Sequence, residues 1–126
     1  MPGKKTPTPA SELEAFLRGK TPYARELFDH FIAQYQKLAP VTVHPAKTMI
    51  GIATSRKRIC YVTQIGKDFI HVIFPFDEPY PDNLCFQKIP QVPGQQQFNH
   101  HFRMHSKEDV NAEVKKYMKL AYTKGR

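Results

Sequence analysis

Histidine side chains form the densest group of residues in this chain that could do chemistry. His100, His101 and His105 fall within six residues, and His71 lies in an apolar run. Imidazole is the commonest protein ligand of transition metals. Neighbours on a strand point to opposite faces, so His100 and His101 cannot both reach one metal ion without a bulge. Arg103 would also repel a cation held between His101 and His105.

These observations favour structural roles for the histidines over a metal site. We expect His100 to lie on the core side of a strand, hydrogen-bonded, and His101 to lie in solvent. The sequence has no HExxH, CxxC or Asp-rich loop, so neither a metal nor another cofactor is expected. The pattern leaves the individual roles of His71, His100, His101 and His105 open.

A second group of side chains is cationic and has aromatic residues near it. The candidate anion-binding residues are Arg56, Lys57, Arg58, His101 and Arg103. The first three lie in one predicted turn, and the last two alternate along a predicted strand. Cationic side chains of this kind bind phosphate oxygens. Tyr61, Phe76 and Tyr80 would suit stacking on bases. The alternative is a solvated turn beside an ordinary polar strand, and the sequence leaves open whether the five residues share a surface.

Neither cysteine is placed like a catalytic nucleophile. Cys60 and Cys85 lie far apart, each is flanked by apolar residues, and buried thiols of this kind are usually inert. Nothing in the sequence orients a Cys–His pair. No complete catalytic motif is present, so we assign no catalytic residue and expect no enzymatic activity. An enzyme of unrecognised class stays a third choice for the function.

The chain is basic, with 19 lysines and arginines, 11 aspartates and glutamates and a formal net charge of +8. A basic excess favours polyanionic partners such as nucleic acid. Lys4, Lys5, Lys124 and Arg126 belong to the two ends, so about half of the excess is left for the folded part. No apolar stretch approaches the ~20 residues that span a bilayer, and no secretory signal is visible. We therefore expect a cytoplasmic protein that does not bind membranes.

Two helices are predicted in the first 40 residues. Residues 1–10 are rich in Pro, Thr and Lys and are predicted to form a disordered basic tail. Ser11 begins a capping-box pattern that predicts a short helix ending at Arg18. Thr21 followed by Pro22 is a clearer helix start. The apolar stripe of this second helix is Tyr23, Leu27, Phe31, Tyr35 and Leu38.

Strands and one more helix are predicted for the rest of the chain. Six runs rich in apolar and β-branched residues predict strands over 41–44, 48–54, 59–65, 69–74, 85–89 and 98–104. Short turns between most of them favour an antiparallel sheet. Ser106 begins the final helix, whose apolar stripe is Val110, Val114, Tyr117, Met118 and Ala121. Pro45 is expected to break the chain between the first two strands.

The predicted fold class is therefore α+β, with N-terminal helices, an antiparallel sheet of five or six strands, and a C-terminal helix packed on the sheet. We expect a single domain over residues 11–122 and a basic C-terminal end over residues 123–126. The run 69–74 is apolar on both strand faces, so we expect both faces of the sheet to be covered. The N-terminal helices or a second copy of the chain would supply the second cover.

Three segments of the chain are similar to a known family. They are Tyr23-Ala24-Arg25-Glu26-Leu27-Phe28, the strand pair RICYVTQIGKDFIHVIF, and the ending from Ser106 to Tyr122. Over roughly Tyr23 to Tyr122 the chain resembles a small bacterial family, the DUF5655-type domain of unknown function, and more distantly the YdhG-like domains. The resemblance supports the fold and carries over no catalytic residue. Family members look like accessory domains, sometimes found beside predicted DNA-acting or restriction-type proteins, which implies a nucleic-acid partner by fold-level analogy.

Basic charge without a catalytic motif favours a binding function. We expect a non-enzymatic binding module for an anionic partner, with nucleic acid the best candidate. The alternative is a protein-interaction or homodimerisation domain whose basic charge is incidental. Salt dependence separates the two, because counterions are released when cations bind phosphates.

Overall fold

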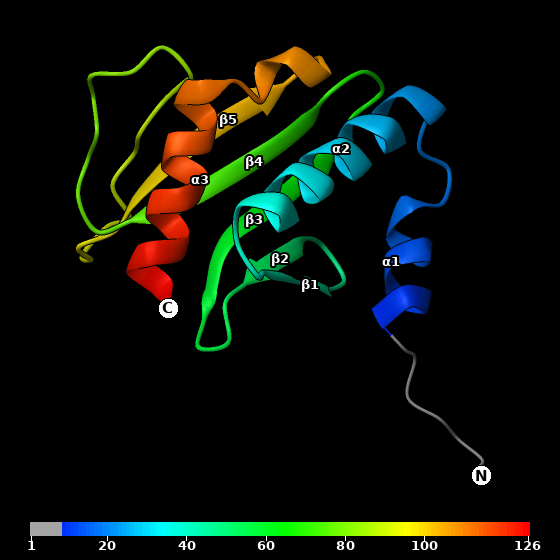
Figure 1. Ribbon diagram of the computed structural model, residues 1–126, viewed down its shortest axis with the longest axis horizontal. Coiled ribbons are helices and arrows are strands. Elements are labelled where there is room, and N and C mark those ends of the chain that lie inside the picture. Colours follow the sequence, from blue (N-terminus) through cyan, green and yellow to red (C-terminus); the bar gives the residue numbers. More distant parts are fainter. Residues whose placement is uncertain (1–8) are drawn as a thin grey trace, which may run out of the picture.

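The computed structural model describes residues 9–126, so most of the predicted disordered tail lies outside the described residues. Within that range the chain forms three α-helices, a short 3₁₀ helix and five strands (Figure 1). They are α1 (Pro9–Leu17), α2 (Pro22–Leu38), β1 (Thr42–Pro45), β2 (Ile50–Ala53), β3 (Arg58–Ile65), β4 (Ile70–Phe76), β5 (Phe98–Met104), η1 (Lys107–Asp109) and α3 (Ala112–Gly125). The predicted α+β class is confirmed.

The five strands form one antiparallel sheet in which each strand pairs with the next along the chain. Short turns join the first four strands, and a long loop, residues 77–97, joins β4 to β5. The sixth predicted strand, over 85–89, is wrong: within it only Lys88 forms an isolated bridge to β5, and Gln91 forms another just beyond it. Pro90 interrupts the ladder because its backbone nitrogen has no hydrogen to donate.

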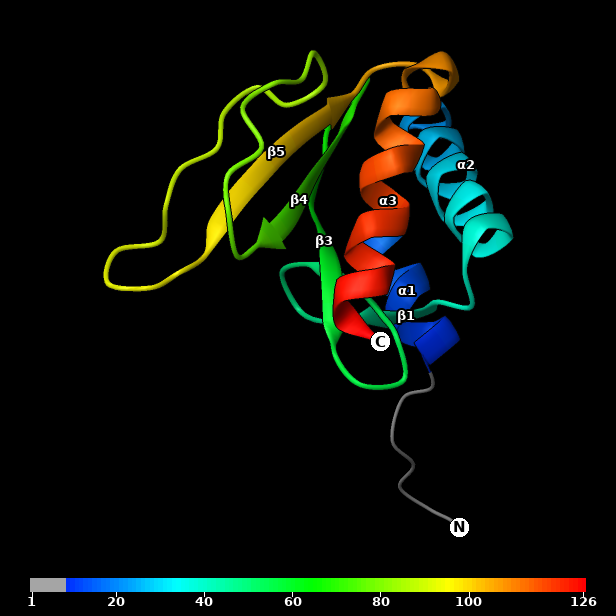
Figure 2. The same cartoon turned by 60° about the vertical axis from the view of Figure 1, so that its left-hand side comes forward.

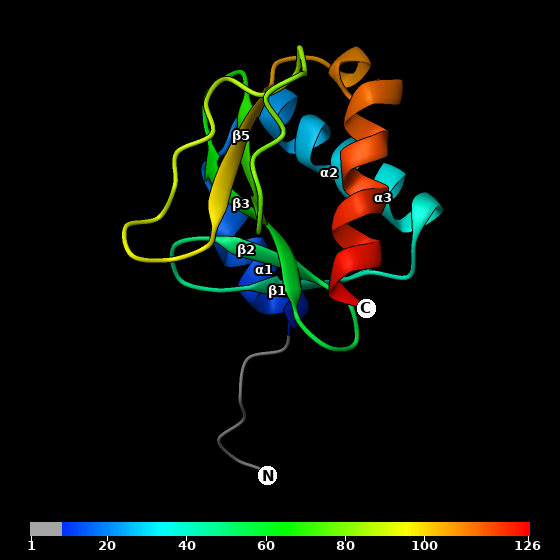
Figure 3. The same cartoon turned by 90° about the vertical axis from the view of Figure 1, so that its left-hand side faces the viewer.

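Helices α2 and α3 pack against each other on one face of the sheet (Figure 2). Their apolar stripes and the inward residues of the strands make the core, whose largest fully buried side chains include Tyr35, Phe28, Phe31, Phe74, Leu27 and Ile50. Helix α1 packs against β1 at the edge of the sheet. We call the sheet face turned away from α2 and α3 the open face, and Figure 3 shows it with neither helix over it. Of the two covers expected for this second face, helix α2 is excluded because it joins α3 on the first face, and a second copy of the chain stays a prediction.

Helix α2 begins at the predicted signals. Thr21 Oγ1 accepts a hydrogen bond from the Ala24 amide at 3.1 Å, and Pro22 is the first helical residue. Most of the predicted stripe is buried, but Tyr23 is 47% exposed. Its hydroxyl donates to the carbonyl oxygen of His105, so this ring ties α2 to the end of β5 from the surface.

The other predicted helix starts are shifted. Helix α1 begins at Pro9, two residues before Ser11 and inside the predicted tail. Ser106 begins only the 3₁₀ helix, and α3 starts after Asn111, whose side chain accepts a hydrogen bond from the Val114 amide at 3.0 Å. Two good capping residues compete in this segment, and the one nearer the buried stripe begins the α-helix. The stripe itself is confirmed, because all five of its residues are buried.

The predicted strands that the structure contains have ends within two residues of the expected ones. Pro45 does not break the chain between strands, since it is the last residue of β1 and pairs with Ile50. A proline is tolerated there because β1 is an edge strand. No helix among the described residues is long and apolar enough to cross a membrane.

Candidate anion-binding sites

The open face brings His71, His101 and Arg103 together. The register of β4 and β5 places His71 opposite Arg103 and Ile73 opposite His101. His71 Nε2 lies 2.8 Å from His101 Nδ1, and Arg103 Nε donates a hydrogen bond to His71 Nδ1 at 3.2 Å. Two of the predicted anion-binding residues, His101 and Arg103, thus share one surface, and His71 connects them.

The two hydrogen bonds of this cluster form a chain in which Arg103 donates to His71 and His71 donates to His101. His71 Nδ1 accepts from Arg103, so a neutral His71 carries its proton on Nε2 and donates it to His101. His101 accepts through Nδ1 and keeps its own proton on Nε2. Burial first, and then the neighbouring His101, Arg103 and Lys88, lower the pKa of His71 to about 4. Burial also lowers the pKa of His101, so both rings are neutral at pH 7.

Arg103 is held by an aromatic ring as well. Its guanidinium carbon lies 4.0 Å from the centroid of the Phe69 ring, a cation–π contact. The His105 ring lies near the same phenyl group, with 6.0 Å between centroids, and takes no part in the chain of hydrogen bonds. Within residues 9–126, no group of three or more His, Cys, Asp or Glu side chains is placed to hold a metal ion.

His100 lies on the core side of β5 and is fully buried, as the alternation predicts. Its Nδ1 lies 2.8 Å from the Phe98 carbonyl oxygen, and its Nε2 accepts a hydrogen bond from the Tyr80 amide at 3.2 Å. The neutral ring with its proton on Nδ1 satisfies both contacts. The prediction of a buried, hydrogen-bonded histidine is confirmed, and His100 attaches the 77–97 loop to the sheet.

The basic turn of Arg56, Lys57 and Arg58 lies far from this cluster. Gln64 is the β3 partner of His71, and Arg58 lies six residues before it, which is about 20 Å of strand. The structure therefore divides the five predicted residues between two regions of the sheet. The five residues therefore do not share one surface.

Contacts at the basic turn connect it to the end of α3. Arg56 Nη1 lies 3.4 Å from the Arg126 carbonyl oxygen. Thr54 Oγ1 donates to the Gly125 carbonyl oxygen at 2.9 Å and accepts from the Arg56 and Lys57 amides. This threonine fixes the turn against the helix, which accounts for its burial.

A cavity of about 280 Å³ lies beside this turn. Lys57 and Arg58 line it together with Tyr61 and Phe76, two of the aromatic residues expected near them. Asp77 lines it too, and its carboxylate forms an ion pair with Lys124 at 3.3 Å. The carboxylate reduces the positive charge that the cavity offers to an anion.

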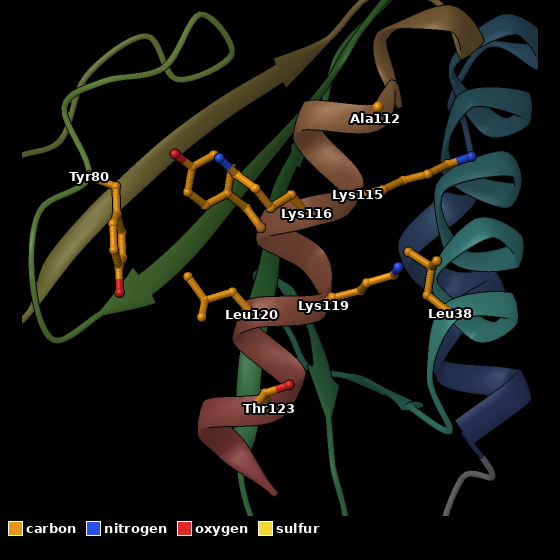
Figure 4. A pocket seen from close by; sticks show the side chains of 9 residues that line it. Leu38, Tyr80, Ala112, Lys115, Lys116, Lys119, Leu120 and Thr123 are labelled. Atoms are coloured by element: carbon orange, nitrogen blue, oxygen red, sulfur yellow. The ribbon is translucent and has the colours of Figure 1, made fainter.

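A larger cavity of about 670 Å³ follows the exposed side of α3, and we call it the lysine groove. Its lining includes Leu38, Tyr80, Lys115, Lys116, Lys119 and Leu120. Figure 4 shows Lys115 and Lys119 extending from α3 toward α2, and Lys116 extending toward the loop that carries Tyr80. The groove therefore has cationic groups along its length and an aromatic ring at one side.

More cations surround the α2 end of the lysine groove. The pKa of His30 on α2 is lowered by burial and then by the positive charges of Lys107, Lys115 and Lys37, and the Glu108 carboxylate offsets part of this effect. These lysines come from η1, α3 and α2, so three elements contribute to one basic region. Ion pairs recorded for residues 9–126 join Arg25 to Glu14 and Lys124 to Asp77, and leave the groove lysines without a carboxylate within 4.0 Å.

The lysine groove is not among the sites predicted from the sequence. Lys115 and Lys119 are one helical turn apart and Lys116 adjoins them, which is a signal for a basic helix face. That signal places the cations on one side of α3, but it does not place Leu38 or Tyr80 next to them. Both of these come from other parts of the chain, so the cavity itself depends on the tertiary fold.

Comparison with known proteins identifies the family. Residues 13–124 match the family described as "Domain of unknown function (DUF5655)". No curated protein and no solved structure matches the chain at a significant level. The more distant resemblance to the YdhG-like domains stays a prediction. Because the match spans most of its length, the chain belongs to the DUF5655 family.

Proposed function

We propose that this chain is a non-enzymatic module that binds single-stranded nucleic acid in the lysine groove. The observation that carries the proposal is that Lys115, Lys116 and Lys119 line one groove and have no carboxylate partner among the described residues. Ammonium groups without such partners release counterions when they contact phosphates, which drives association. Phosphate contacts of this kind position a strand without selecting its sequence.

Tyr80 supports the choice of a single strand. This ring is half-buried at the side of the lysine groove, and the hydrogen bond between its amide and His100 fixes the backbone that carries it. Bases of a single strand can stack on such a ring, whereas bases inside a duplex are already stacked. Leu38 and Leu120 add apolar surface in the same groove.

The alternative is a protein-interaction or homodimerisation domain with incidental basic charge. Its surface would be the open face, which carries the half-buried side chain of Ile73 opposite His101. Binding through that face would depend weakly on salt, whereas binding through the lysine groove would depend on it strongly. A cytoplasmic location stays a prediction and fits either function.

The test is fluorescence anisotropy of labelled 12-nucleotide single strands and duplexes with the full chain, at low and near-physiological salt. The double variant Lys115→Gln, Lys119→Gln removes two groove cations. Lys47→Gln, Lys67→Gln is the matched control, because both lysines are exposed on turns of the sheet and the net charge changes equally. A third variant, Lys4→Gln, Lys5→Gln, measures the contribution of the basic N-terminal residues.

The proposal predicts tighter binding of the single strand and a loss of at least about tenfold in the groove variant alone, from two phosphate contacts. Equal losses in the groove and turn variants would show that only net charge matters and would overturn it. Loss confined to the N-terminal variant would also overturn it. Salt-independent self-association by light scattering, without oligonucleotide binding, would favour the homodimer.

A further inference from the structure

The open face carries a second group of basic side chains, separate from the lysine groove. Lys88 bridges His101 in antiparallel fashion, and the His101 amide donates to the Lys88 carbonyl oxygen at 3.0 Å. Residues paired in this way place their side chains on the same face, with Cβ atoms about 5 Å apart. Lys88 is exposed, so its ammonium group stands in solvent beside the His101 ring.

Arg103 supplies a fixed pair of donors at this place. Its Nε–H is used by His71, and its plane rests on the Phe69 ring. Phe69 is fixed in turn, since it packs so closely on Gly66 that a Cβ there would lie 2.2 Å from the phenyl ring. The Nη1 and Nη2 groups have no hydrogen-bond partner recorded among residues 9–126 and can donate in parallel to two oxygens of one anion. An arginine held in this way loses little side-chain entropy on binding.

His101 supplies a further donor. Its Nδ1 accepts from His71, so its remaining proton is on Nε2, for which no protein partner is recorded in the described residues. No buried side-chain nitrogen or oxygen lacks a partner there, so this N–H is open to solvent. The charged groups that act on the pKa values of His71 and His101 are all basic, and no carboxylate is among them. The cluster therefore offers several donors and no competing anion.

We propose that Arg103, His101 and Lys88 form a binding site for a phosphate monoester group on the open face of the sheet. The parallel N–H groups of Arg103 bind two of the three terminal phosphate oxygens, and His101 Nε2–H and the Lys88 ammonium bind the third. Three different donors fit a tetrahedral dianion better than a planar carboxylate, which has only two oxygens. The site shares no residue with the lysine groove, so it is independent of nucleic-acid binding there.

The test is a titration of the ¹⁵N-labelled full chain with inorganic phosphate, and separately with phenyl phosphate, at pH 7.5 and constant ionic strength. Saturable shifts of the amide signals of Lys88, His101 and Arg103 are expected with both probes. Arg103→Lys keeps the charge but loses the parallel donors, and is expected to weaken binding about tenfold. Lys88→Gln removes only an exposed ammonium group, and a loss of about threefold is expected.

One control variant makes the outcome decisive. The groove variant Lys115→Gln, Lys119→Gln is expected to bind phosphate as the wild type does, because its residues lie on α3. Shifts confined to α3, or a loss of phosphate affinity in the groove variant, would overturn the proposal. Wild-type affinity in Arg103→Lys would overturn it too. If Arg103→Lys does not fold, the test depends on Lys88→Gln alone. Unchanged phosphate affinity in Lys88→Gln would then refute the site.

Discussion

His71 Nε2 and His101 Nδ1 lie 2.8 Å apart on neighbouring strands, a contact that needs one proton between two ring nitrogens. Arg103 already donates to the other nitrogen of His71, so that nitrogen carries no proton, and the neutral His71 ring donates from Nε2 to His101. A proton added to His101 Nδ1 would place two N–H groups against each other. The open face is therefore held together by histidines in their neutral forms.

Acid is expected to destabilise the fold through His71. In the folded chain its pKa is lowered from 6.5 to about 4, by burial first and by His101, Arg103 and Lys88 next. Above about pH 6.5 this contribution to stability is fully present. As the pH falls toward 4, the unfolded chain binds a proton that the folded chain does not, so the contribution is progressively lost. Urea unfolding at pH 7.5 and pH 5.0 measures the resulting fall in the free energy of unfolding.

Variants separate this effect from general acid denaturation. His71→Gln has no imidazole to titrate, so its free energy of unfolding should fall less between pH 7.5 and 5.0 than that of the wild type. His44→Gln is the control, because His44 is exposed on the edge strand β1. Equal falls in the wild type and in His71→Gln would contradict the assignment.

Removing the Tyr35 hydroxyl is expected to cost about 1 kcal/mol of stability. This buried group donates to the Met118 carbonyl oxygen at 2.7 Å and so joins α2 to α3. Tyr35→Phe keeps the ring in the core and loses only that bond. Tyr122→Phe, at a half-buried ring whose hydroxyl has no recorded partner in the described residues, should stay within about 0.5 kcal/mol of wild type. Chemical denaturation of both variants checks the difference.

Local signals in the sequence predicted most of the secondary structure. Thr21 and Pro22 mark the start of α2 because capping depends on neighbouring residues alone. The alternation along 98–104 is also a pattern of neighbouring residues, and it predicted which side of β5 is buried. His100 is indeed in the core. Where two local signals competed, as at Ser106 and Asn111, packing of the α3 stripe decided between them.

Non-local relationships could not be predicted in this way. Arg58 and Arg103 both belong to strands with readable patterns, yet only the register shows that they lie at different ends of the sheet. His71 joins His101 because β4 and β5 pair across a long loop whose length says nothing about register. Tyr80 lies beside α3 because His100 holds its backbone, a contact between residues 20 positions apart.

Replacing His100 should release the 77–97 loop. His100→Phe keeps an aromatic ring in the core but removes the acceptor of the Tyr80 amide, leaving that N–H without its partner. An amide that loses its acceptor exchanges with solvent whenever the loop opens. Hydrogen exchange at Tyr80 is therefore expected to rise, together with a loss of about 1–3 kcal/mol in stability. Unchanged protection at Tyr80 would show that other contacts hold the loop.

Both thiols are expected to react slowly in the folded chain. Burial raises the pKa of the Cys60 thiol, and burial together with the Glu113 carboxylate raises that of Cys85 to about 12. Only the thiolate attacks disulfide reagents, so little reaction is expected at pH 8 until the chain is unfolded in guanidinium. Glu113→Gln should accelerate Cys85, while Glu108→Gln should not. Ellman's reagent follows both rates, and equal rates in the two variants would contradict the role of Glu113.

The salt dependence of oligonucleotide binding should report how many groove lysines contact phosphates. For a single strand, the slope of log affinity against log salt changes by about 0.7 for each phosphate that is neutralised. If Lys115 and Lys119 each neutralise one, their double glutamine variant should have a slope shallower by about 1.4 than the wild type. The control variant Lys47→Gln, Lys67→Gln should keep the wild-type slope, because its lysines lie on turns outside the groove. Anisotropy titrations at five salt concentrations give the three slopes. A slope that falls equally in both variants would mean that the oligonucleotide responds to net charge and has no defined path along α3.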